Sequence, residues 1–343
     1  MRALVLGAGV AGLACAVELA ERGVAVEVLE RGERLGVGCC SWYAGGMLAP
    51  WCERESAEPL VAALGLESLR WWPARFPGTV LRGTLVEAHG RDAGELRQFA
   101  RRTEHYQWLD GEAVGALEPD LAGRFSQALH FPEEGHLDPR AALAALAAKL
   151  AALGAQIRFG AGTEPCREAA RAAQAAGATV IDCRGLEARD ALPDLRGVKG
   201  EMLLVRLPEI SLSRPVRVLH PRVPVYIVPR GDGHYMIGAT MIESDQPTRI
   251  TARSLLELLG AAYALHPAFG EAEIIEIGTG VRPAFPDNLP RVQRIGGTIH
   301  VNGLYRHGFL LAPALARHAA EQVLAAGHSS EVMHADSHQR RLA

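Results

Sequence analysis

The chain opens with Arg2-Ala3-Leu4-Val5-Leu6-Gly7-Ala8-Gly9-Val10-Ala11-Gly12, an apolar run that ends in three spaced glycines. A second apolar run, Val26 to Leu29, is followed directly by Glu30. This order predicts a strand, a glycine turn, a helix, a second strand and an acidic residue at the end of that strand. The pattern favours the α/β class, in which helices cover a largely parallel sheet.

Each glycine of this stretch has a separate role in a dinucleotide-binding turn. Gly7 lets the chain turn sharply, Gly9 lets backbone approach a pyrophosphate, and Gly12 lets the helix lie close to the sheet. The helix N-terminus then faces the phosphates, where free N–H groups favour negative charge. Glu30 is placed to accept hydrogen bonds from ribose hydroxyls and would repel a 2′-phosphate, so FAD or NAD is expected rather than NADP. The alternative is a purely structural glycine turn.

Length and composition set further bounds on the class of protein. With 343 residues, two intertwined domains are expected. Apolar residues make up 48% of the chain, but no run approaches the roughly 20 that a membrane-spanning helix needs. Glycines and Glu18 interrupt any signal-peptide core, which predicts a soluble cytoplasmic protein that does not enter a membrane. The net charge of −3, without a basic block, gives no support for nucleic-acid binding.

Six cysteines are scattered through the chain without CxxC spacing, so neither a zinc site nor a secreted disulfide framework is indicated. Cys39 and Cys40 are adjacent. We interpret them as reduced thiols packed beside the cofactor, in preference to a redox pair or a covalent flavin link.

The remaining chain alternates between two kinds of pattern. A helix is expected from Leu13 to Arg22, a second from Asp138, its N-cap, to Leu153, and buried strands at 154–159 and 178–185. Strands rich in Val, Leu, Ile and Tyr are expected at 79–88, 201–206, 225–229 and 235–239, the last two joined by a hairpin turn at 230–233. We therefore expect a Rossmann-type nucleotide-binding domain at 1–80, 137–200 and 282–343, with a mixed, largely antiparallel substrate domain at 81–136 and 201–281. The tail from Gly327 is polar and expected to be loose.

The C-terminal third holds a second strand-turn-helix pattern. The stretch from His300 to Pro313 (HVNGLYRHGFLLAP) runs from strand through a glycine turn into a helix. A helix N-terminus at Gly308 would direct its positive end at a cofactor carbonyl that gains negative charge on reduction.

Taken in order, these segments resemble glycine oxidase, in the D-amino-acid-oxidase group of flavoproteins. The resemblance is carried by the N-terminal fingerprint and by the segments SWYAGGMLAP at 41–50, YIVPR at 226–230, GATM at 238–241, GVRP at 280–283 and YRHGFLLAP at 305–313. It runs from Arg2 to about residue 320, so it covers nearly the whole chain. The order and spacing of the segments carry it rather than any one motif.

The resemblance implies noncovalent FAD between two domains and oxidative deamination of glycine or of small N-alkyl or D-amino acids. Hydride transfer to flavin N5 would give an imine, which water hydrolyses to the 2-oxo acid and ammonia, and O2 would be reduced to H2O2. In such enzymes the reaction often serves thiazole synthesis for thiamine. The flavin carries the electron chemistry, so no protein acid or base is nominated.

The resemblance also implies roles for individual residues. Arg282 would clamp the substrate carboxylate as a planar cationic fork, Tyr226 would add a donor, and Met241 and Arg306 would line the pocket. With the fingerprint, the expected cofactor contacts are Gly7, Gly9, Val10, Ala11, Gly12, Glu30, Arg31, Cys40, Ser41, Gly45, Gly46, Met47, Arg282, Leu304, Tyr305, Arg306, His307, Gly308, Phe309 and Leu310.

Each assignment has a structural alternative. Arg282 would instead pair with Asp287, Arg306 would be a phosphate-binding or surface arginine, and Tyr226 would pack in a core. His307 and Cys40 are interpreted as structural neighbours of the flavin. The pair Trp71-Trp72 is interpreted as a buried helix face rather than a membrane or partner contact.

Two departures from the family pattern concern the site. Cys39-Cys40-Ser41 stands where small or hydroxyl residues are usual. Residues 221–225 leave the rim of the pocket undefined, and an apolar rim would suit a larger or N-substituted amino acid.

Two other functions remain open at this point. One is a D-amino-acid dehydrogenase that passes electrons to an acceptor other than O2, and the other is a noncatalytic FAD-binding protein. A homo-oligomer is compatible with the sequence.

Overall fold

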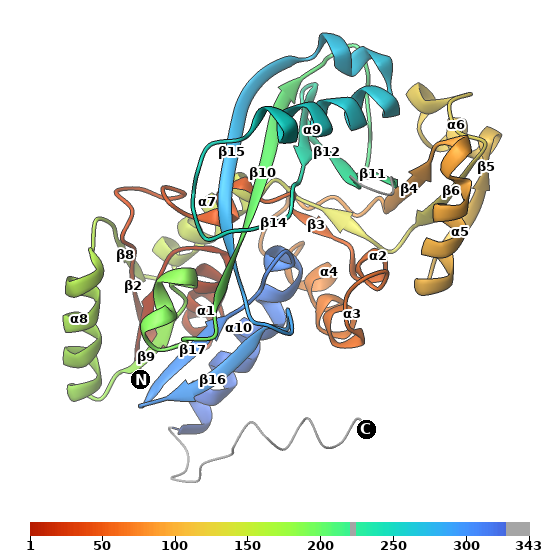
Figure 1. Cartoon of the computed structure of the whole chain (residues 1–343). Helices are drawn as coiled ribbons and strands as arrows, with labels where there is room; N and C mark the ends of the chain where they lie inside the picture. Colours follow the sequence, from red (N-terminus) through yellow and green to blue (C-terminus); the bar gives the residue numbers. More distant parts are fainter. Residues whose placement is uncertain (220–223, 327–343) are drawn as a thin grey trace.

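The fold was examined in a computed structural model, which describes residues 1–219 and 224–326. The described residues form two large β-sheets and a small two-stranded one (Figure 1). The predicted α/β fold class is confirmed. The predicted tail from Gly327 lies outside the described residues.

The first sheet is the predicted nucleotide-binding sheet. Its strand order in the described chain is β16 (Arg291–Ile295), β17 (Thr298–Asn302), β9 (Thr179–Asp182), β1 (Arg2–Leu6), β2 (Ala25–Leu29) and β8 (Gln156–Arg158). All neighbouring pairs are parallel except β16 with β17. β1 therefore lies between two parallel neighbours, so the turn after Leu6 reaches the carboxyl edge of the sheet, where ligands of open α/β sheets bind.

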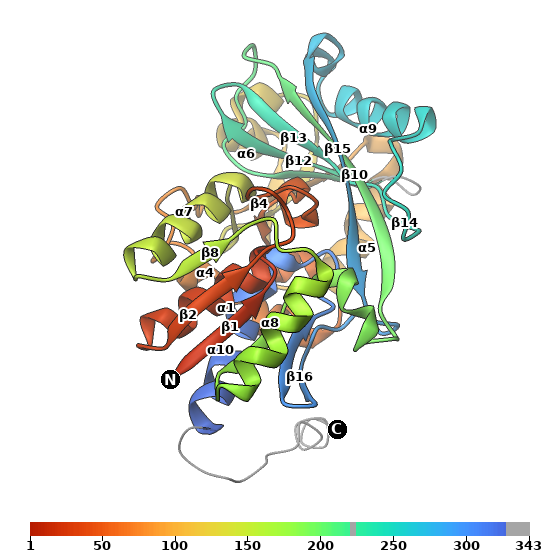
Figure 2. The same ribbon diagram turned by 90° about the vertical axis from the view of Figure 1, so that its left-hand side faces the viewer.

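Helices cover both faces of this sheet. Alternate residues of β1 point to opposite faces, so they show which helices lie on each side. Ala3 and Val5 pack with α1 (Val10–Glu21), α7 (Pro139–Ala152) and α10 (Gly308–Ala326), whereas Leu4 and Leu6 pack with α8 (Thr163–Ala175). Figure 2 shows α8 on the side of the sheet opposite α10.

The second sheet forms the upper body in Figure 1. In the described chain its order is β14 (Ile242–Glu243), β10 (Arg196–Arg206), β13 (His234–Gly238), β12 (Val225–Gly231), β11 (Val216–Leu219), β4 (Thr84–Ala88), β6 (Gln127–Phe131) and β5 (Gln107–Asp110), and β15 (Glu273–Ala284) also pairs with β10. Its pairs are antiparallel except β4 with β11. The helices α5 (Ala93–Arg102), α6 (Gly111–Leu117) and α9 (Ala252–Leu265) pack against it.

Short elements connect the two bodies. They are the strands β3 (Met47–Leu48) and β7 (Gly135–His136), which pair with each other, and the helices α2 (Pro50–Glu53), α3 (Pro59–Gly65) and α4 (Ser68–Trp71). The predicted discontinuous domains stay a prediction, and β10 and β15 run across the predicted boundaries after residues 200 and 281.

Most predicted elements are confirmed, including the β12–β13 hairpin and the helix with Asp138 as N-cap. The predicted strand 79–88 is wrong in its first half, because Gly83 turns the chain at φ +81° and the strand begins at Thr84. The strand predicted at 201–206 begins earlier, at Arg196, since Gly197 and Gly200 weaken the sequence signal where other groups approach the backbone closely.

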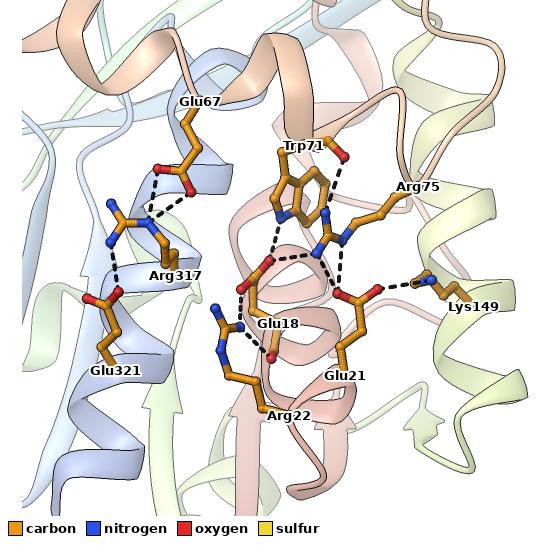
Figure 3. Close-up of polar contacts among 9 residues, drawn as sticks. All are labelled: Glu18, Glu21, Arg22, Glu67, Trp71, Arg75, Lys149, Arg317 and Glu321. Atoms are coloured by element: carbon orange, nitrogen blue, oxygen red, sulfur yellow. Dashed lines mark hydrogen bonds and ion pairs between the residues drawn. The ribbon is translucent and has the colours of Figure 1, made fainter.

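A polar network fixes α1 to its surroundings (Figure 3). The buried carboxylate of Glu18 accepts hydrogen bonds from the Trp71 indole N–H and from the guanidinium groups of Arg22 and Arg75. Trp71 and Trp72 are both buried, which confirms the interpretation of this pair as a buried helix face. No helix among the described residues has the length and apolar character needed to cross a membrane.

Candidate functional site

A cavity of about 640 Å³ opens at the carboxyl end of β1. Gly7, at φ +95°, turns the chain out of the strand, and Gly9 lines the cavity. A Cβ on Gly12 would stand 1.9 Å from the Gly7 carbonyl oxygen, so this position requires glycine for the tight turn between strand and helix. The turn therefore has the geometry that its sequence predicts.

Glu30 holds this turn in place. Its carboxylate accepts hydrogen bonds from the Ala8 N–H at 2.6 Å and the Gly32 N–H at 2.8 Å, and the residue lines the cavity. Each carboxylate oxygen retains acceptor capacity. Hydrogen bonding of Glu30 to a ribose therefore stays a prediction, and Glu30 has an additional role in shaping the turn.

The cavity wall combines expected and unexpected residues. The expected ones are Gly7, Gly9, Val10, Ala11, Glu30, Arg31, Cys40, Ser41, Leu304, Tyr305 and Gly308. Among the residues that sequence reasoning missed are Cys39, Tyr43, Arg184, Gly185, Glu187, Arg189, Asp245, Thr279 and Gly280. The carboxyl end of β9 was a usable signal for Arg184 and Gly185, because it adjoins that of β1 in the same parallel sheet.

Two ion pairs lie at the solvent edge of this cavity. Arg31 pairs with Glu187 at 2.7 Å, and Arg189 pairs with Asp245 at 3.0 Å. All four side chains are partly exposed and line the cavity.

A second, smaller cavity of about 90 Å³ adjoins the first at Gly308, the first residue of α10, which lines both. The four predicted substrate residues, Tyr226, Met241, Arg282 and Arg306, all line it. The predicted cofactor contacts Gly45, Gly46, Met47, His307, Phe309 and Leu310 also line this cavity and not the larger one. The structure thus brings together residues from four distant parts of the chain.

Tyr226 and Arg282 approach this cavity from the second sheet. Tyr226, on β12, lies close to Gly45: a Cβ added at Gly45 would be 2.7 Å from the Cε2 atom of Tyr226. Burial raises the pKa of the Tyr226 phenol, so its hydroxyl remains a donor. Arg282, on β15, donates from Nη1 to the Thr240 carbonyl oxygen at 3.1 Å. The alternative of an Arg282–Asp287 pair is wrong, because Asp287 pairs with Arg291 at 3.1 Å.

Arg306 is held by partners on and after α2. Its Nη2 donates to Glu53 Oε2 at 2.7 Å and to Ser56 Oγ at 2.6 Å, and its Nη1 lies 3.6 Å from Met241 Sδ. The Glu53 carboxylate raises the pKa of Arg306, which stays charged. Arg306 lines the small cavity, so it is neither a simple surface arginine nor, in this arrangement, a wall of the larger cavity.

Comparison with known proteins identifies the family. Residues 2–322 match the model of the FAD dependent oxidoreductase family. The chain belongs to this family of FAD-dependent oxidoreductases. It is 58% identical, over 94% of this chain and 97% of the relative, to a putative thiamine biosynthesis oxidoreductase ThiO of Rhizobium etli. It is 31% identical to glycine oxidase of Geobacillus kaustophilus, over 90% of this chain and 89% of that protein.

Solved structures agree with the fold. The crystal structure of glycine oxidase from Geobacillus kaustophilus superposes with a TM-score of 0.78 and 26% identity, covering 94% of this chain and 95% of that one. The expected resemblance and the FAD-binding fold are thereby confirmed.

The larger cavity fits the FAD of this oxidoreductase family. Its volume of about 640 Å³ lies within the roughly 300–1,000 Å³ of cofactor and ligand pockets. Gly9 leaves backbone open at the turn, where an added Cβ would meet only Cys39 Sγ and Ser41 Oγ. In the turn, the Ala8 N–H already donates to Glu30 and the Val10 N–H to Ser41 Oγ at 3.2 Å. The N-terminus of α1 would supply the positive potential that a pyrophosphate requires, and Glu30 would supply an acceptor.

The six cysteines of this FAD-dependent oxidoreductase are free thiols in the structure. Cys39 and Cys40 lie in the cavity wall, and burial together with Cys39 raises the pKa of Cys40 to about 12. Burial also raises the pKa of Cys39. Both remain protonated at neutral pH, which agrees with the interpretation of packed thiols and disfavours a reactive pair.

Sequence reasoning missed two charged residues of the small cavity, Glu53 and Arg217. Burial opposes ionisation of Glu53, but Arg306, His307 and Arg217 outweigh it and lower the pKa of Glu53 to about 2. Burial lowers the pKa of His307 to about 4, so its ring is neutral at pH 7. The small cavity is also lined by the apolar Pro224 and Val225, whereas residues 221–223 of the expected rim lie outside the described residues. An apolar rim stays a prediction.

Proposed function

We propose that this FAD-dependent oxidoreductase oxidises glycine, or a similarly small amino acid, and that it serves formation of the thiazole of thiamine. The names of relatives support this, because one is a putative thiamine biosynthesis oxidoreductase and several are glycine oxidases. We include cytoplasmic location and the use of O2 in the proposal. Assembly into a homo-oligomer stays open.

One observation carries the proposal. A guanidinium, Arg282, and a phenol, Tyr226, converge on a small cavity that adjoins the cofactor cavity at the N-terminus of α10. The small cavity, about 90 Å³, is far smaller than the adjoining cavity of about 640 Å³. Its size supports a small amino acid as the substrate.

Arg282 and Tyr226 would hold the substrate carboxylate through hydrogen bonds. Arg282 offers two parallel N–H donors to a carboxylate, and the Tyr226 hydroxyl offers a third donor. Holding the carboxylate at this point fixes the α-carbon near the junction of the two cavities, and positioning of this kind supplies much of a rate enhancement. Hydride transfer from a neutral amine needs no protein base. The pKa of about 2 also makes the cavity-lining Glu53 a weak base.

When bound, FAD supplies the two-electron acceptor for this chemistry, and its reoxidation by O2 would give H2O2. The substrate-derived imine is then hydrolysed by water to the 2-oxo acid and ammonia. The α10 N-terminus, with Gly308 at its first turn, offers positive potential where the cofactor cavity meets the substrate cavity.

The experiment is anaerobic mixing of the purified holoenzyme with glycine, sarcosine and D-alanine, followed by admission of air. Bleaching of the flavin absorbance by glycine, with rapid recovery and peroxide formation in air, is the expected result. Bleaching without recovery would move the assignment to a dehydrogenase, and absence of bleaching with all three amino acids would overturn the substrate proposal. Turnover of sarcosine but not glycine would assign an N-substituted substrate.

Arg282→Ala is expected to lower the apparent affinity for glycine by about 100-fold or more, since a charged carboxylate partner is lost. Arg294→Ala, an exposed arginine on β16, is the matched control. Glycine-dependent flavin reduction that survives intact in Arg282→Ala would exclude the carboxylate clamp and favour a noncatalytic or differently organised site.

A further inference from the structure

The small cavity has three arginines in its wall, Arg217, Arg282 and Arg306, although a carboxylate needs one bidentate partner. The arginines differ in what they already bind. This difference determines which of them an incoming carboxylate meets as an unpaired charge.

Arg306 already has a carboxylate partner within the protein. One nitrogen, Nη2, donates to both Glu53 Oε2 at 2.7 Å and Ser56 Oγ at 2.6 Å. The pair is largely buried, with side-chain exposures of 20% for Arg306 and 15% for Glu53. At this burial an ion pair is only weakly screened, so Glu53 cancels most of the attraction that Arg306 exerts on an anion.

Arg217 is also balanced by acids. Its guanidinium lies 3.6 Å from Glu53 Oε1 and 3.8 Å from Glu55 Oε2. The two carboxylates, Glu53 and Glu55, therefore face the two guanidinium groups of Arg217 and Arg306.

Arg282 differs from both. Within residues 1–219 and 224–326 it forms no ion pair with a carboxylate, and its guanidinium donates a hydrogen bond to a neutral group, the Thr240 carbonyl oxygen. Glu55 also pairs with Arg102 at 3.3 Å, outside the cavity wall. Among the three arginines of the cavity wall, Arg282 is the one without a carboxylate partner in the described chain.

We propose that Glu53 is a positioning residue that sets the direction of substrate binding: by neutralising Arg306, it leaves Arg282 as the one guanidinium of the cavity wall, within the described residues, that is available to the substrate carboxylate. The inference rests on the proposed function, because it concerns how an amino acid enters the same cavity. The substrate class that it assigns is a singly charged carboxylate, since a second anionic group would find both remaining arginines already paired.

A purely structural role of Glu53 makes a different prediction. If Glu53 only fastens α2 to the segment before α10, its loss weakens every ligand and the fold together. If it masks Arg306, its loss exposes a second anion site, and simple carboxylates bind more tightly while glycine binds in two orientations.

The test is a titration of the FAD-loaded enzyme with acetate, in which the change in the flavin spectrum reports acetate binding. In Glu53→Gln we expect acetate to bind about tenfold more tightly, as a nearby unpaired positive charge is gained. We expect kcat/KM for glycine to fall about tenfold or more, with substrate inhibition from the second orientation. Acetate affinity that is unchanged or weaker, with FAD content and Tm as in the parent, would overturn the proposal.

Two further variants make the result specific. Glu53→Gln combined with Arg306→Met restores a neutral pair, so both acetate affinity and kcat/KM for glycine should return toward the parent values. Failure of this second change to reverse the first also overturns the proposal. Glu67→Gln is the matched control, because Glu67 accepts hydrogen bonds from Arg317 away from both cavities.

The design remains decisive if Glu53→Gln is obtained without FAD. The double variant then carries the test alone, and acetate affinity within about threefold of the parent supports the proposal, whereas a loss beyond tenfold means that Arg306 itself binds the carboxylate. Acetate binding is read without turnover. Failure of the glycine assignment, seen as absence of bleaching in the parent enzyme, is therefore distinct from failure of this inference.

Discussion

The guanidinium of Arg282 on β15 lies directly against the backbone of Gly200 on the neighbouring strand β10. A Cβ at position 200 would stand 2.2 Å from Nη2 and 2.4 Å from Cζ of Arg282. Because β10 and β15 pair in antiparallel register with Val198 opposite Arg282, the arginine side chain crosses diagonally over the smaller residue. Gly200 therefore provides the space in which the guanidinium group lies.

Gly200→Ala should displace the guanidinium group and weaken glycine binding without loss of FAD. We expect KM for glycine to rise about tenfold or more, because misplacing a positioning group by about 1 Å has effects of that size. Steady-state kinetics and the flavin content of the purified protein measure the two quantities.

Gly260→Ala is the matched control for this substitution. Gly260 lies on the exposed side of α9 with nothing within 4 Å of an added Cβ. The Gly260→Ala substitution should leave the kinetics unchanged and raise the free energy of unfolding by up to about 1 kcal/mol, the difference in helix propensity between the two residues. If Gly200→Ala left the kinetics as unchanged as Gly260→Ala does, glycine binding would not depend on the space that Gly200 provides for the Arg282 guanidinium.

Gly12→Ala is expected to abolish FAD binding. The added Cβ would lie 1.9 Å from the Gly7 carbonyl oxygen, and backbone atoms at the turn have no free space to move into. The variant should purify colourless, while Gly94→Ala on α5, where an added Cβ meets nothing within 4 Å, should purify with full flavin. Flavin absorbance per chain decides the outcome, and a fully yellow Gly12→Ala variant contradicts the geometry.

Local sequence was sufficient for the parts of the site that depend on a contiguous motif. Gly7, Gly12 and Glu30 form one strand-turn-helix unit, and their spacing alone predicts the turn that the structure contains. Tyr226 and Arg282 were located through resemblance, and the structure brings them to one cavity from strands that are not neighbours in the sheet.

The residues that were missed act through contacts across the fold. Glu53 follows Trp51 and Cys52 in a short helix without any motif, and its partners, Arg306 and Arg217, are far away in sequence. Only the packing of α2 against β4 and β6 of the second sheet, seen at Cys52, brings this carboxylate to its two arginines. A similar limit applies to β10, where glycines that make room for other groups hide the start of the strand.

Glu18→Gln should destabilise the protein more than the removal of an exposed carboxylate does. The Glu18 side chain is 4% exposed and binds Arg75 at 3.0 Å, and it also accepts from Trp71 and Arg22 (Figure 3). Losing its charge weakens the hydrogen bonds from the buried Trp71 indole and from Arg22, and leaves Arg75 paired with Glu21 alone, at a cost of about 2 kcal/mol. Urea unfolding measures this cost.

The comparison for that experiment is Glu321→Gln. Glu321 is 52% exposed and pairs with Arg317 on the surface of α10. We expect its loss to change the unfolding free energy by less than about 0.5 kcal/mol. Equal effects of the two substitutions would show that the buried network does not stabilise α1.

Glu87→Gln should remove a pH dependence of stability. Glu87 is fully buried on β4, and burial, followed by the charge of Glu118, raises its pKa to about 8 from an ordinary value of 4.5. Neither carboxylate oxygen has a hydrogen-bond partner among the described residues. The folded protein thus keeps a proton that the unfolded chain has released, so between pH 4.5 and about 8 stability falls as pH rises.

The neutral glutamine has no proton to lose, so the variant should lack this fall and be more stable than the parent at pH 8 by about 1–3 kcal/mol. Urea midpoints of both proteins at about pH 5.5, 7 and 8.5 give the slope directly. Glu112→Gln, at an exposed position of α6, should keep the parental slope. Identical slopes for the parent and Glu87→Gln would mean that Glu87 is ionised in the folded state at neutral pH, and a charged partner or water would then have to reach it.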